Sequence, residues 1–258
     1  MAPYGKGFVG VFDSGVGGIS VLRELARQLP HEDFRYFGDS AFAPYGEKER
    51  DWVLRRSRDI VDDLLDQGAK AIVIACNTAT SAAASTLRAD YAHVPIIGVE
   101  PALKPATLAE RSGRILVMAT PITLRLDKYQ QLAQRWGGGH EVIPVPCPGL
   151  AARIEQGNLD APDLQDLLQS LVGAWAGTVD SVVLGCTHYP FIARQIRAVV
   201  GDVPLFDGAR GTALQLKRKL AERSLLSFSR EPGRVEFASS RQTPEEIALY
   251  RRFFEGRV

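Results

Sequence analysis

Two short segments of this chain share one pattern, and together they restrict the folds that the chain can adopt. Residues 71–78 and 181–188 are each an apolar run that ends in a small residue, a cysteine and then polar side chains. Such a run is typical of a strand buried on both faces, as in a parallel sheet covered by helices. We therefore expect two matched strands, which deliver two matched thiols, Cys76 and Cys186, to the loops that follow them.

Strand-like and helix-like patterns alternate along the chain, and the alternation starts twice. The first series predicts strands at 7–12, 34–37, 71–75 and 96–99, and helices at 18–29, 48–67 and 78–91. The second series predicts strands at 114–119, 141–145, 181–185 and 203–206, and helices at 123–136, 163–176 and 190–200. A helix at 212–225, a strand at 235–238 and a helix at 244–254 close the chain. This order predicts an α/β fold of parallel sheets with helices on both faces.

The pattern breaks near residues 101–105 and again near residues 207–211, which are the expected crossings between two domains. We therefore expect two pseudo-symmetric parallel-sheet α/β domains with the active site in the cleft between them. The first domain would comprise residues 1–100 plus 211–258 and would carry Asp13 and Cys76. The second would comprise residues 101–210 and would carry Cys186 and His188.

Charge and hydropathy exclude several classes of protein. Lys and Arg number 31 against 30 Asp and Glu, so no net field would gather a polyanion, and nucleic acid is not expected as a primary partner. No apolar run reaches the roughly 18 residues of a membrane span, and residues 1–6 contain no apolar signal core. The 3 cysteines are too few and odd in number for a disulfide framework. We expect a soluble cytoplasmic protein with reduced thiols and no membrane partner.

In open α/β sheets the ligand lies beyond the carboxyl ends of the strands. The segments expected there are small, polar and hydroxylated, and none of them carries a cation. They are residues 13–18, 38–40, 44–46, 76–78, 119–123, 154–157 and 186–190.

Glycines follow the first predicted strand at positions 15, 17 and 18, where the next helix begins. Their spacing is G-x-G-G rather than the G-x-G-x-x-G of dinucleotide-binding loops, and the Asp13 carboxylate would repel a pyrophosphate. A nest of backbone N–H groups suited to a carboxylate fits the loop better. A tight turn without any ligand is the structural alternative.

Four of these segments carry a resemblance to a known family. Residues 13–18 (DSGVGG), 44–46 (PYG), 75–78 (ACNT) and 184–190 (LGCTHYP) resemble, in this order, the signature segments of the glutamate racemases. That family is a cofactor-independent branch of the aspartate/glutamate racemase superfamily. The resemblance extends over residues 7–220, and the segment around Cys186 is its most specific part. Departures from the usual pattern occur at Ser40, Ala119 and Gly208, and none of them removes a thiol.

The resemblance implies an isomerase that interconverts L-glutamate and D-glutamate and supplies D-glutamate for peptidoglycan. It implies glutamate as the substrate, no cofactor, no metal and a possible homodimer. Its chemistry agrees with the paired thiols, because inverting a stereocentre requires a base on one face of the carbon and an acid on the other. By resemblance, Cys76 would take the α-proton from D-glutamate and Cys186 would take it from L-glutamate.

The resemblance also assigns partners to the thiols: Asp13 would serve Cys76, and His188 would serve Cys186. Asp39 and Glu155 match further acidic positions implicated in the family, although each would also suit a cap or a solvated turn. His188 lies two residues beyond Cys186, so in an extended segment both side chains would point to the same face.

The predicted contacts to the substrate are short polar side chains and one tight loop. They are Asp13, Ser14, Tyr45, Gly46, Asn77, Thr78, Thr123, Thr187 and His188, with Thr120 as a further candidate. Without a cation at these positions, hydrogen bonds would have to stabilise the carbanionic intermediate. The third cysteine, Cys147, stands between two prolines without a matching segment, and we interpret it as structural.

Other functions use parts of this pattern. Cys76, Cys186 and His188 are acceptable zinc ligands, but the chain has no close Cys-x-x-Cys pair. A cysteine hydrolase would leave the second thiol unexplained, and a binding module would have no use for paired thiols. Aspartate racemase and related racemases or decarboxylases of the same superfamily remain the nearest alternatives.

Overall fold

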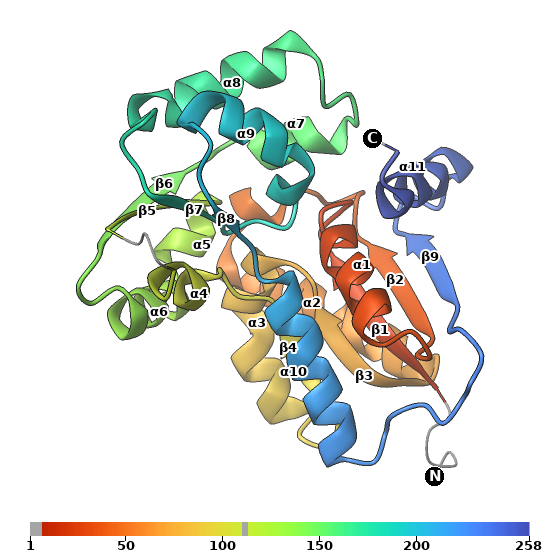
Figure 1. The fold of residues 1–258 in the computed structure, drawn as a ribbon. Helices are drawn as coiled ribbons and strands as arrows, with labels where there is room; N and C mark the ends of the chain where they lie inside the picture. Colours follow the sequence, from red (N-terminus) through yellow and green to blue (C-terminus); the bar gives the residue numbers. More distant parts are fainter. Residues whose placement is uncertain (1–6, 110–112, 258) are drawn as a thin grey trace.

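Two parallel sheets form the framework of the protein, each in its own lobe (Figure 1). The computed structural model describes residues 7–109 and 113–257; residues 1–6, where the sequence contains no apolar signal core, lie outside them. The first sheet has the strand order β4-β3-β1-β2-β9 and the second has the order β6-β5-β7-β8. All neighbouring strands run parallel. The predicted α/β class is therefore confirmed.

The strands agree closely with the apolar runs in the sequence. Those of the first sheet are β1 (Phe8–Asp13), β2 (Phe34–Gly38), β3 (Ala69–Ile74), β4 (Ile96–Gly98) and β9 (Val235–Ser239). Those of the second sheet are β5 (Arg114–Ala119), β6 (Glu141–Pro146), β7 (Ser181–Leu184) and β8 (Leu205–Phe206).

Helices cover both faces of each sheet. Around the first sheet lie α1 (Ile19–Gln28), η1 (Tyr45–Glu47), α2 (Arg50–Asp66), α3 (Asn77–Asp90), α10 (Ala209–Glu222) and α11 (Pro244–Glu255). Around the second lie α4 (Leu103–Thr107), α5 (Pro121–Arg125), α6 (Asp127–Trp136), α7 (Leu150–Glu155), α8 (Pro162–Val172), η2 (Gly173–Trp175), η3 (Tyr189–Ile192) and α9 (Ala193–Val200).

The alternation of side chains along each strand explains these layers. In the first sheet, Val9 and Val11 belong to an apolar cluster that includes α1 and α10. Ile72 and Ile74 belong to a second cluster, formed with α2 and α3. Strands with a helix layer on each face must be apolar on both faces, which is why they read as continuous apolar runs.

The two sheets share one topology. Strands β1 to β4 lie in the order 4-3-1-2, and β5 to β8 repeat it as 8-7-5-6. The strand before Cys76 (β3) and the strand before Cys186 (β7) therefore occupy equivalent places, each beside the first strand of its series. The similarity of the two sequence segments thus reflects an equivalence in three dimensions.

The structure differs from the sequence predictions in three ways. The single helix predicted over residues 123–136 is two helices, α5 and α6, because Leu126 adopts an extended conformation (φ −78°, ψ 144°) between them. The short helices α4 and α7 were not predicted at all. The last strand of the second series is shorter than expected and covers only Leu205–Phe206.

The chain crosses between the lobes twice, after β4 and after β8, and the crossings lie side by side (Figure 1). They are in contact, because a Cβ atom at Gly208 would overlap the backbone oxygen of Glu100. After the second crossing, α10 packs on α1, and β9 pairs with β2. The division into residues 1–100 plus 211–258 and residues 101–210 stays a prediction.

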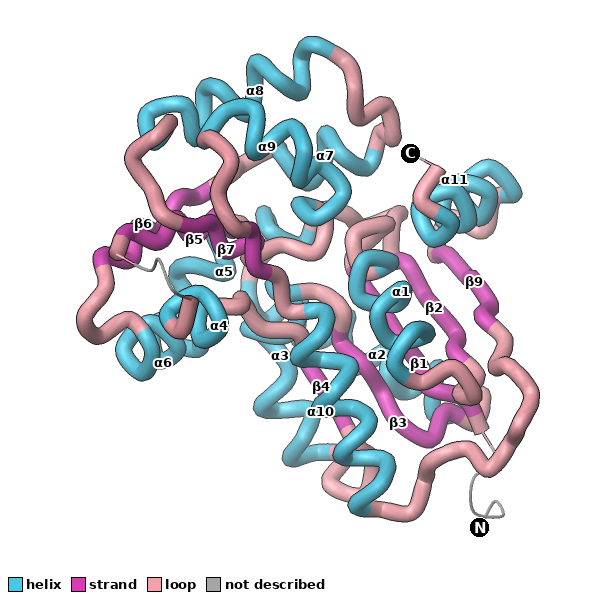
Figure 2. Tube along the Cα trace, viewed as in Figure 1, coloured by secondary structure: helices cyan, strands magenta, loops and turns pink. Residues whose placement is uncertain are grey.

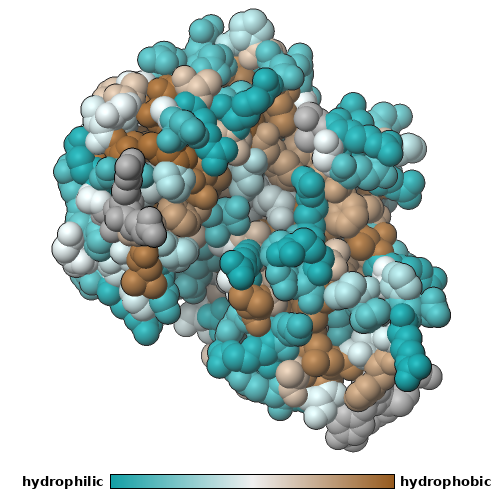
Figure 3. Space-filling model, in the orientation of Figure 1, coloured by the Kyte–Doolittle hydropathy of each residue, from teal (hydrophilic) through white to brown (hydrophobic). Residues whose placement is uncertain are grey.

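The loops that follow the strands gather between the lobes (Figure 2). The surface is mostly hydrophilic at the periphery of the view in Figure 3, and apolar residues are concentrated toward its middle. One buried cluster includes residues from both sheets, among them Val11 and Leu116. Within the described residues, no helix has the length and apolar character needed to cross a membrane.

The C-terminal helix should contribute strongly to stability. Phe253 of α11 is fully buried, and its ring meets that of Phe191 from the other lobe edge to face, with centroids 4.6 Å apart. We expect Phe253→Ala to lower the free energy of unfolding by about 3–5 kcal/mol, measured by urea denaturation. Phe228→Ala is the control, because that ring is 80% exposed. A loss at Phe253 no larger than at Phe228 would contradict this packing.

Candidate active site

The predicted site residues converge at the carboxyl ends of the strands of both sheets. In the first lobe, backbone hydrogen bonds join Asp39 N to Asp13 O (2.9 Å) and Ala75 N to Phe12 O (2.8 Å). These bonds place the ends of β1, β2 and β3 side by side. In the second lobe, the bond from Gly185 N to Met118 O (2.7 Å) does the same for β5 and β7. The two sets of loops meet across the seam between the lobes.

Cys186 is the first member of a row of three side chains, of which Cys186 and His188 are buried and Glu155 is 17% exposed. Its Sγ lies 3.5 Å from Nδ1 of His188, and Nε2 of His188 lies 2.5 Å from Oε1 of Glu155. His188 has helical backbone angles (φ −75°, ψ −33°) at the start of η3. The predicted proximity of Cys186 and His188 is therefore present, but it arises from a turn and not from an extended segment.

Glu155 also connects the two lobes. It is the last residue of helix α7, whereas the sequence suggested a strand end, and its Oε1 accepts a hydrogen bond from Val16 N at 2.8 Å. Cβ atoms at Gly15 and Gly17 would overlap the side chains of Glu155 and His188, respectively. The glycines thus allow close contact between the lobes. The loop does hold a carboxylate, and that carboxylate comes from the chain itself.

The surroundings of His188 favour its charged form. Burial by itself lowers the pKa of an imidazole, but the negative charges of Cys186 and Glu155 on either side outweigh it. Together with the hydrogen bonds to both groups, they raise the pKa of His188 well above its usual value. The arrangement can hold an imidazolium between a thiolate and a carboxylate.

Cys76 lies in different surroundings. It caps the N-terminus of α3, where its Sγ accepts a hydrogen bond from Ala79 N at 3.4 Å and lies 4.0 Å from Ser14 Oγ. Burial, followed by the nearby Asp13 carboxylate, raises the pKa of the Cys76 thiol far above its usual value. The hydrogen bond from Ala79 N acts in the opposite direction and is outweighed. The surroundings of Cys76 therefore favour the neutral thiol.

Asp13 links the surroundings of the two thiols. Its Oδ1 accepts from Gly15 N at 2.8 Å, and its Oδ2 accepts from Thr187 Oγ1 of the other lobe at 2.9 Å. The side chain is completely buried. Burial is the largest influence on it and raises its pKa to about 6, even though the charge on His188 acts in the opposite direction. Asp13 acts on Cys76 through its charge, since its recorded hydrogen bonds go to other groups.

Three threonine hydroxyls form a triangle across the seam. Thr78 Oγ1 lies 3.0 Å from Thr120 Oγ1 and 3.3 Å from Thr123 Oγ1, and the last two are 2.8 Å apart. Beside them, Asn77 is buried at the start of α3, and its Oδ1 has no hydrogen-bond partner in the structure. These groups provide donors and acceptors for a small polar ligand.

The remaining predicted residues lie on the loop after β2. Both oxygens of Asp39 are hydrogen-bonded, to Arg56 and to the hydroxyl of Tyr45, and neither bond reaches a thiol. Gly46 follows Tyr45 and faces Thr120, since a Cβ there would lie 2.9 Å from Thr120 Cβ. Ser40, one of the departures from the family pattern, pairs with the Tyr250 hydroxyl at 2.6 Å.

The sequence analysis missed two contributors to the site. Arg56 lies in the middle of α2, beside the buried positions Val53 and Ser57. Its place next to the apolar stripe of this helix was the one sequence signal that its side chain is directed toward the protein. Tyr189 is fully buried, and burial, followed by the charges of Cys186 and Cys147, raises the pKa of its hydroxyl well above the usual value. Among the described residues this hydroxyl has no hydrogen-bond partner. Cys147, which we interpreted as structural, therefore lies close behind Cys186.

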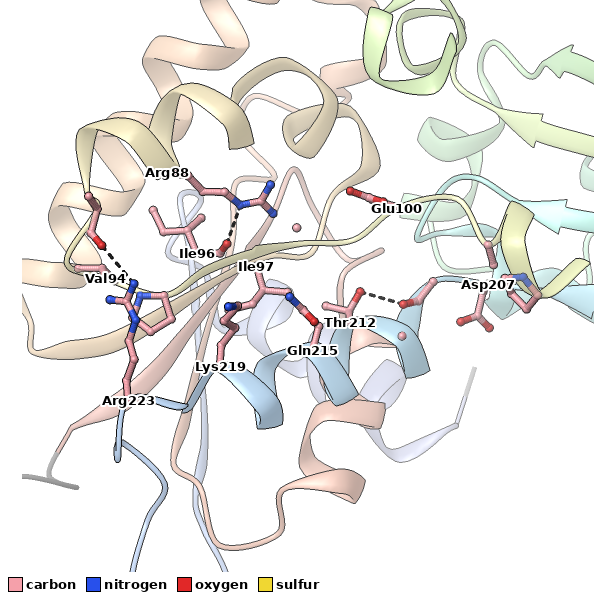
Figure 4. A pocket seen from close by; sticks show the side chains of 17 residues that line it. Arg88, Val94, Ile96, Ile97, Glu100, Asp207, Thr212, Gln215, Lys219 and Arg223 are labelled. Carbon is pink, nitrogen blue, oxygen red and sulfur yellow. Dashed lines mark hydrogen bonds between the residues drawn. The ribbon is translucent and has the colours of Figure 1, made fainter. Parts of the chain in front are cut away.

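A cavity of about 610 Å³ lies apart from this site, between β4, α3, α10 and the two crossings (Figure 4). Arg88, Lys219 and Arg223 lie toward one end of it, and Glu100 and Asp207 lie toward the other. None of the predicted site residues lines it. Across residues 7–109 and 113–257, no group of three or more His, Cys, Asp or Glu side chains could hold a metal ion.

Comparison with known proteins assigns the class. Residues 9–216 match the family model described as Asp/Glu/Hydantoin racemase. The chain belongs to this family, whose members are isomerases.

Individual relatives are named for one reaction of this family, the racemisation of glutamate. A glutamate racemase of Clostridium novyi is 48% identical over 93% of this chain and 93% of its own length. The structure of glutamate racemase from Thermus thermophilus in complex with beta-chloro-D-alanine has 36% identity and a TM-score of 0.79, covering 97% of this chain and 94% of that one. The structure of the Francisella tularensis enzyme in complex with D-glutamate has 29% identity and a TM-score of 0.83, covering 96% and 94%.

The pKa of Asp13 leads to a prediction about stability. Folding raises this pKa from 3.8 to about 6, so the wild-type chain loses stability as the pH rises from about 4 to about 6. The full loss amounts to about 3 kcal/mol, because one pKa unit corresponds to about 1.4 kcal/mol. Asn cannot ionise. Asp13→Asn should therefore gain stability relative to the wild type across this range, measured by urea denaturation at several pH values, and a constant difference would contradict the raised pKa.

Proposed function

We propose that this protein is a glutamate racemase that uses Cys76 and Cys186 as its two acid–base groups and needs no pyridoxal phosphate. The observation that carries this proposal is the equivalence of the two thiols, since each follows the third strand of its sheet. Both lie at the seam between the lobes. Relatives named glutamate racemase, one of them solved with D-glutamate, support glutamate as the substrate.

The different surroundings of the thiols define a starting state for the reaction. The His188 imidazolium stabilises a thiolate on Cys186, while Cys76 keeps its proton. With L-glutamate, Cys186 removes the α-proton and Cys76 donates its own proton to the opposite face of the carbon. Cys186 then holds the proton and Cys76 is the thiolate. D-glutamate reacts from this second state by the same steps in reverse.

Asp13 and Glu155 take supporting roles in this scheme. Asp13 lies close enough to Cys76 to influence it electrostatically, and with a pKa of about 6 it can gain or lose a proton near neutral pH. It is suited to accept the proton that Cys76 must lose before D-glutamate reacts. Glu155 holds His188 by its far nitrogen and so fixes the orientation of the ring.

Glutamate would be bound by neutral polar groups. The threonine triangle and Ser14 offer hydroxyl donors for the two carboxylates, and the free Oδ1 of Asn77 offers an acceptor for the ammonium group. Thr187, also a predicted contact, would have to release Asp13 before its hydroxyl could donate to the substrate. Such preorganised donors in a site without water also stabilise the negative charge that develops when the α-proton leaves. Cys76 and Cys186 are only 5% and 6% exposed, so we propose that the lobes separate to admit the substrate.

The biological role follows from the family resemblance. We propose that the D-glutamate is used in peptidoglycan synthesis. An aspartate racemase, or another amino-acid racemase of the same superfamily, is the alternative, because the thiol chemistry is independent of the length of the side chain.

The reaction can be tested directly in deuterium oxide. With L-glutamate and no added pyridoxal phosphate, the optical rotation should decay while the α-proton NMR signal disappears, because each turnover returns a deuteron from solvent. L-aspartate in a parallel reaction decides between the two substrates. If neither amino acid exchanges its α-proton, the proposed function is wrong.

The two-base scheme predicts the effect of removing each thiol. Cys76→Ala and Cys186→Ala should each lower kcat for racemisation at least about 100-fold, the low end of what one acid–base group contributes. Cys147→Ala is the matched control, since it removes a buried thiol that has no step in the scheme. Racemisation at the wild-type rate by either of the first two variants would exclude a two-thiol mechanism.

A further inference from the structure

Arg56 holds the loop that follows β2 through a fully buried carboxylate. Its Nε donates to Asp39 Oδ2 at 2.8 Å, and its Nη2 donates to Asp39 Oδ1 at 2.6 Å. The side chain of Asp39 is completely inaccessible to solvent, whereas that of Arg56 is 24% exposed. A bidentate pair of this kind fixes both the position and the orientation of the carboxylate.

The same loop contacts Arg56 at a second point. The guanidinium carbon lies 4.6 Å from the centre of the Phe42 ring, and Phe42 in turn packs beside Trp52 of α2. Tyr45 also packs edge to face with Trp52, with centroids 5.4 Å apart. The segment 39–47, called the Asp39 loop from here on, is therefore held against α2 by one ion pair and three aromatic rings.

Tyr45 connects the ion pair to the reaction site. Its hydroxyl donates to Asp39 Oδ2 at 2.5 Å, and burial together with the Asp39 charge keeps the pKa of this phenol above its usual value. The Tyr45 ring is buried and lies close enough to Cys76 for a charge on that sulfur to raise the pKa of the phenol. Next to it, Gly46 faces Thr120 of the other lobe with no room for a side chain. A displacement of the Asp39 loop would therefore reach both Cys76 and the threonine triangle.

We propose that Arg56 is a positioning residue for racemisation, which holds the Asp39 loop so that Tyr45 and Gly46 complete the substrate-binding surface. This inference rests on the proposed function. It assigns Asp39 to the same task, because both of its oxygens are already bound to Arg56 and Tyr45. The recorded hydrogen bonds of Arg56 go to Asp39 and to neither thiol, so its loss should weaken substrate binding more than proton transfer.

Arg56→Met is the first test. Displacement of a binding loop by about 1 Å is enough to lower kcat/KM about 100-fold, and we expect a loss of this size, mainly as a higher KM. Arg56→Lys should be intermediate, since lysine keeps the charge but cannot form the bidentate pair. Arg58→Met is the matched control, because Arg58 lies on the same helix and forms an exposed ion pair with Asp90 at 2.5 Å. It should keep the wild-type kcat and KM.

A double-mutant cycle with Asp39→Asn tests whether Arg56 affects kcat/KM through its pairing with Asp39. Arg56→Met alone leaves a buried carboxylate without its cation, which also threatens folding. In the Asp39→Asn background that charge is absent, so the double variant should fold, and Arg56→Met should cost far less in kcat/KM than it does alone. Equal costs in both backgrounds would show that Arg56 does not act through Asp39.

The fluorescence of Trp52 reports whether the Asp39 loop stays packed against α2, and the measurement needs no catalytic turnover. The chain has 3 tryptophans, and Trp136→Phe with Trp175→Phe leaves Trp52 as the only fluorophore of this type. In that background, Arg56→Met should increase quenching of Trp52 by acrylamide, whereas Arg58→Met should not. Wild-type kinetics and unchanged quenching in Arg56→Met would overturn the inference. If the unmodified chain fails to racemise glutamate, the proposed function fails, while the quenching still shows whether Arg56 holds the loop.

Discussion

The carboxylate of Glu155 is the contact on which the site depends. One of its oxygens accepts hydrogen bonds from His188 Nε2 within its own lobe and from Val16 N in the other lobe. The Glu155 side chain is only 17% exposed, and a charge so largely removed from water is costly without partners, so these bonds help the carboxylate to remain in the seam. The glycine loop owes its sequence to this contact, since a side chain at Gly15 or Gly17 would push Glu155 or His188 away.

A symmetric framework thus supports an asymmetric site. The repeated strand order places one thiol at the end of β3 and the other at the end of β7, at matching positions. The topology alone would make the two thiols equivalent. Their partners do not match: an imidazole backed by a carboxylate stands beside Cys186, and the Asp13 carboxylate stands near Cys76. A racemase needs this difference, because one group must start as the base while the other starts as the acid.

Periodic patterns allowed the strands and both thiols to be predicted, because buried parallel strands are apolar on both faces. The short helices α4 and α7 were missed, since helices of 5 and 6 residues carry too little periodicity to recognise. The contact between Glu155 and Val16 joins residues 139 positions apart, and no local pattern encodes it. The pairing of Arg56 with Asp39 likewise depends on how α2 lies against β2, so only the three-dimensional structure reveals it.

Closure of the lobes and the protonation of the site depend on the same bonds. In the function proposed above, glutamate can reach the buried thiols only if the lobes separate, and separation would break the bonds from Val16 to Glu155 and from Thr187 to Asp13. Water then reaches Asp13, so the burial that raises its pKa to about 6 is lost and the carboxylate reverts toward full ionisation. In the proposed scheme, the contribution of Asp13 to the difference between the thiols therefore exists only in the closed form, whereas Cys186, His188 and Glu155 stay together in one lobe. Closure around glutamate would thus raise the pKa of Asp13 near Cys76 and leave the partners of Cys186 in place.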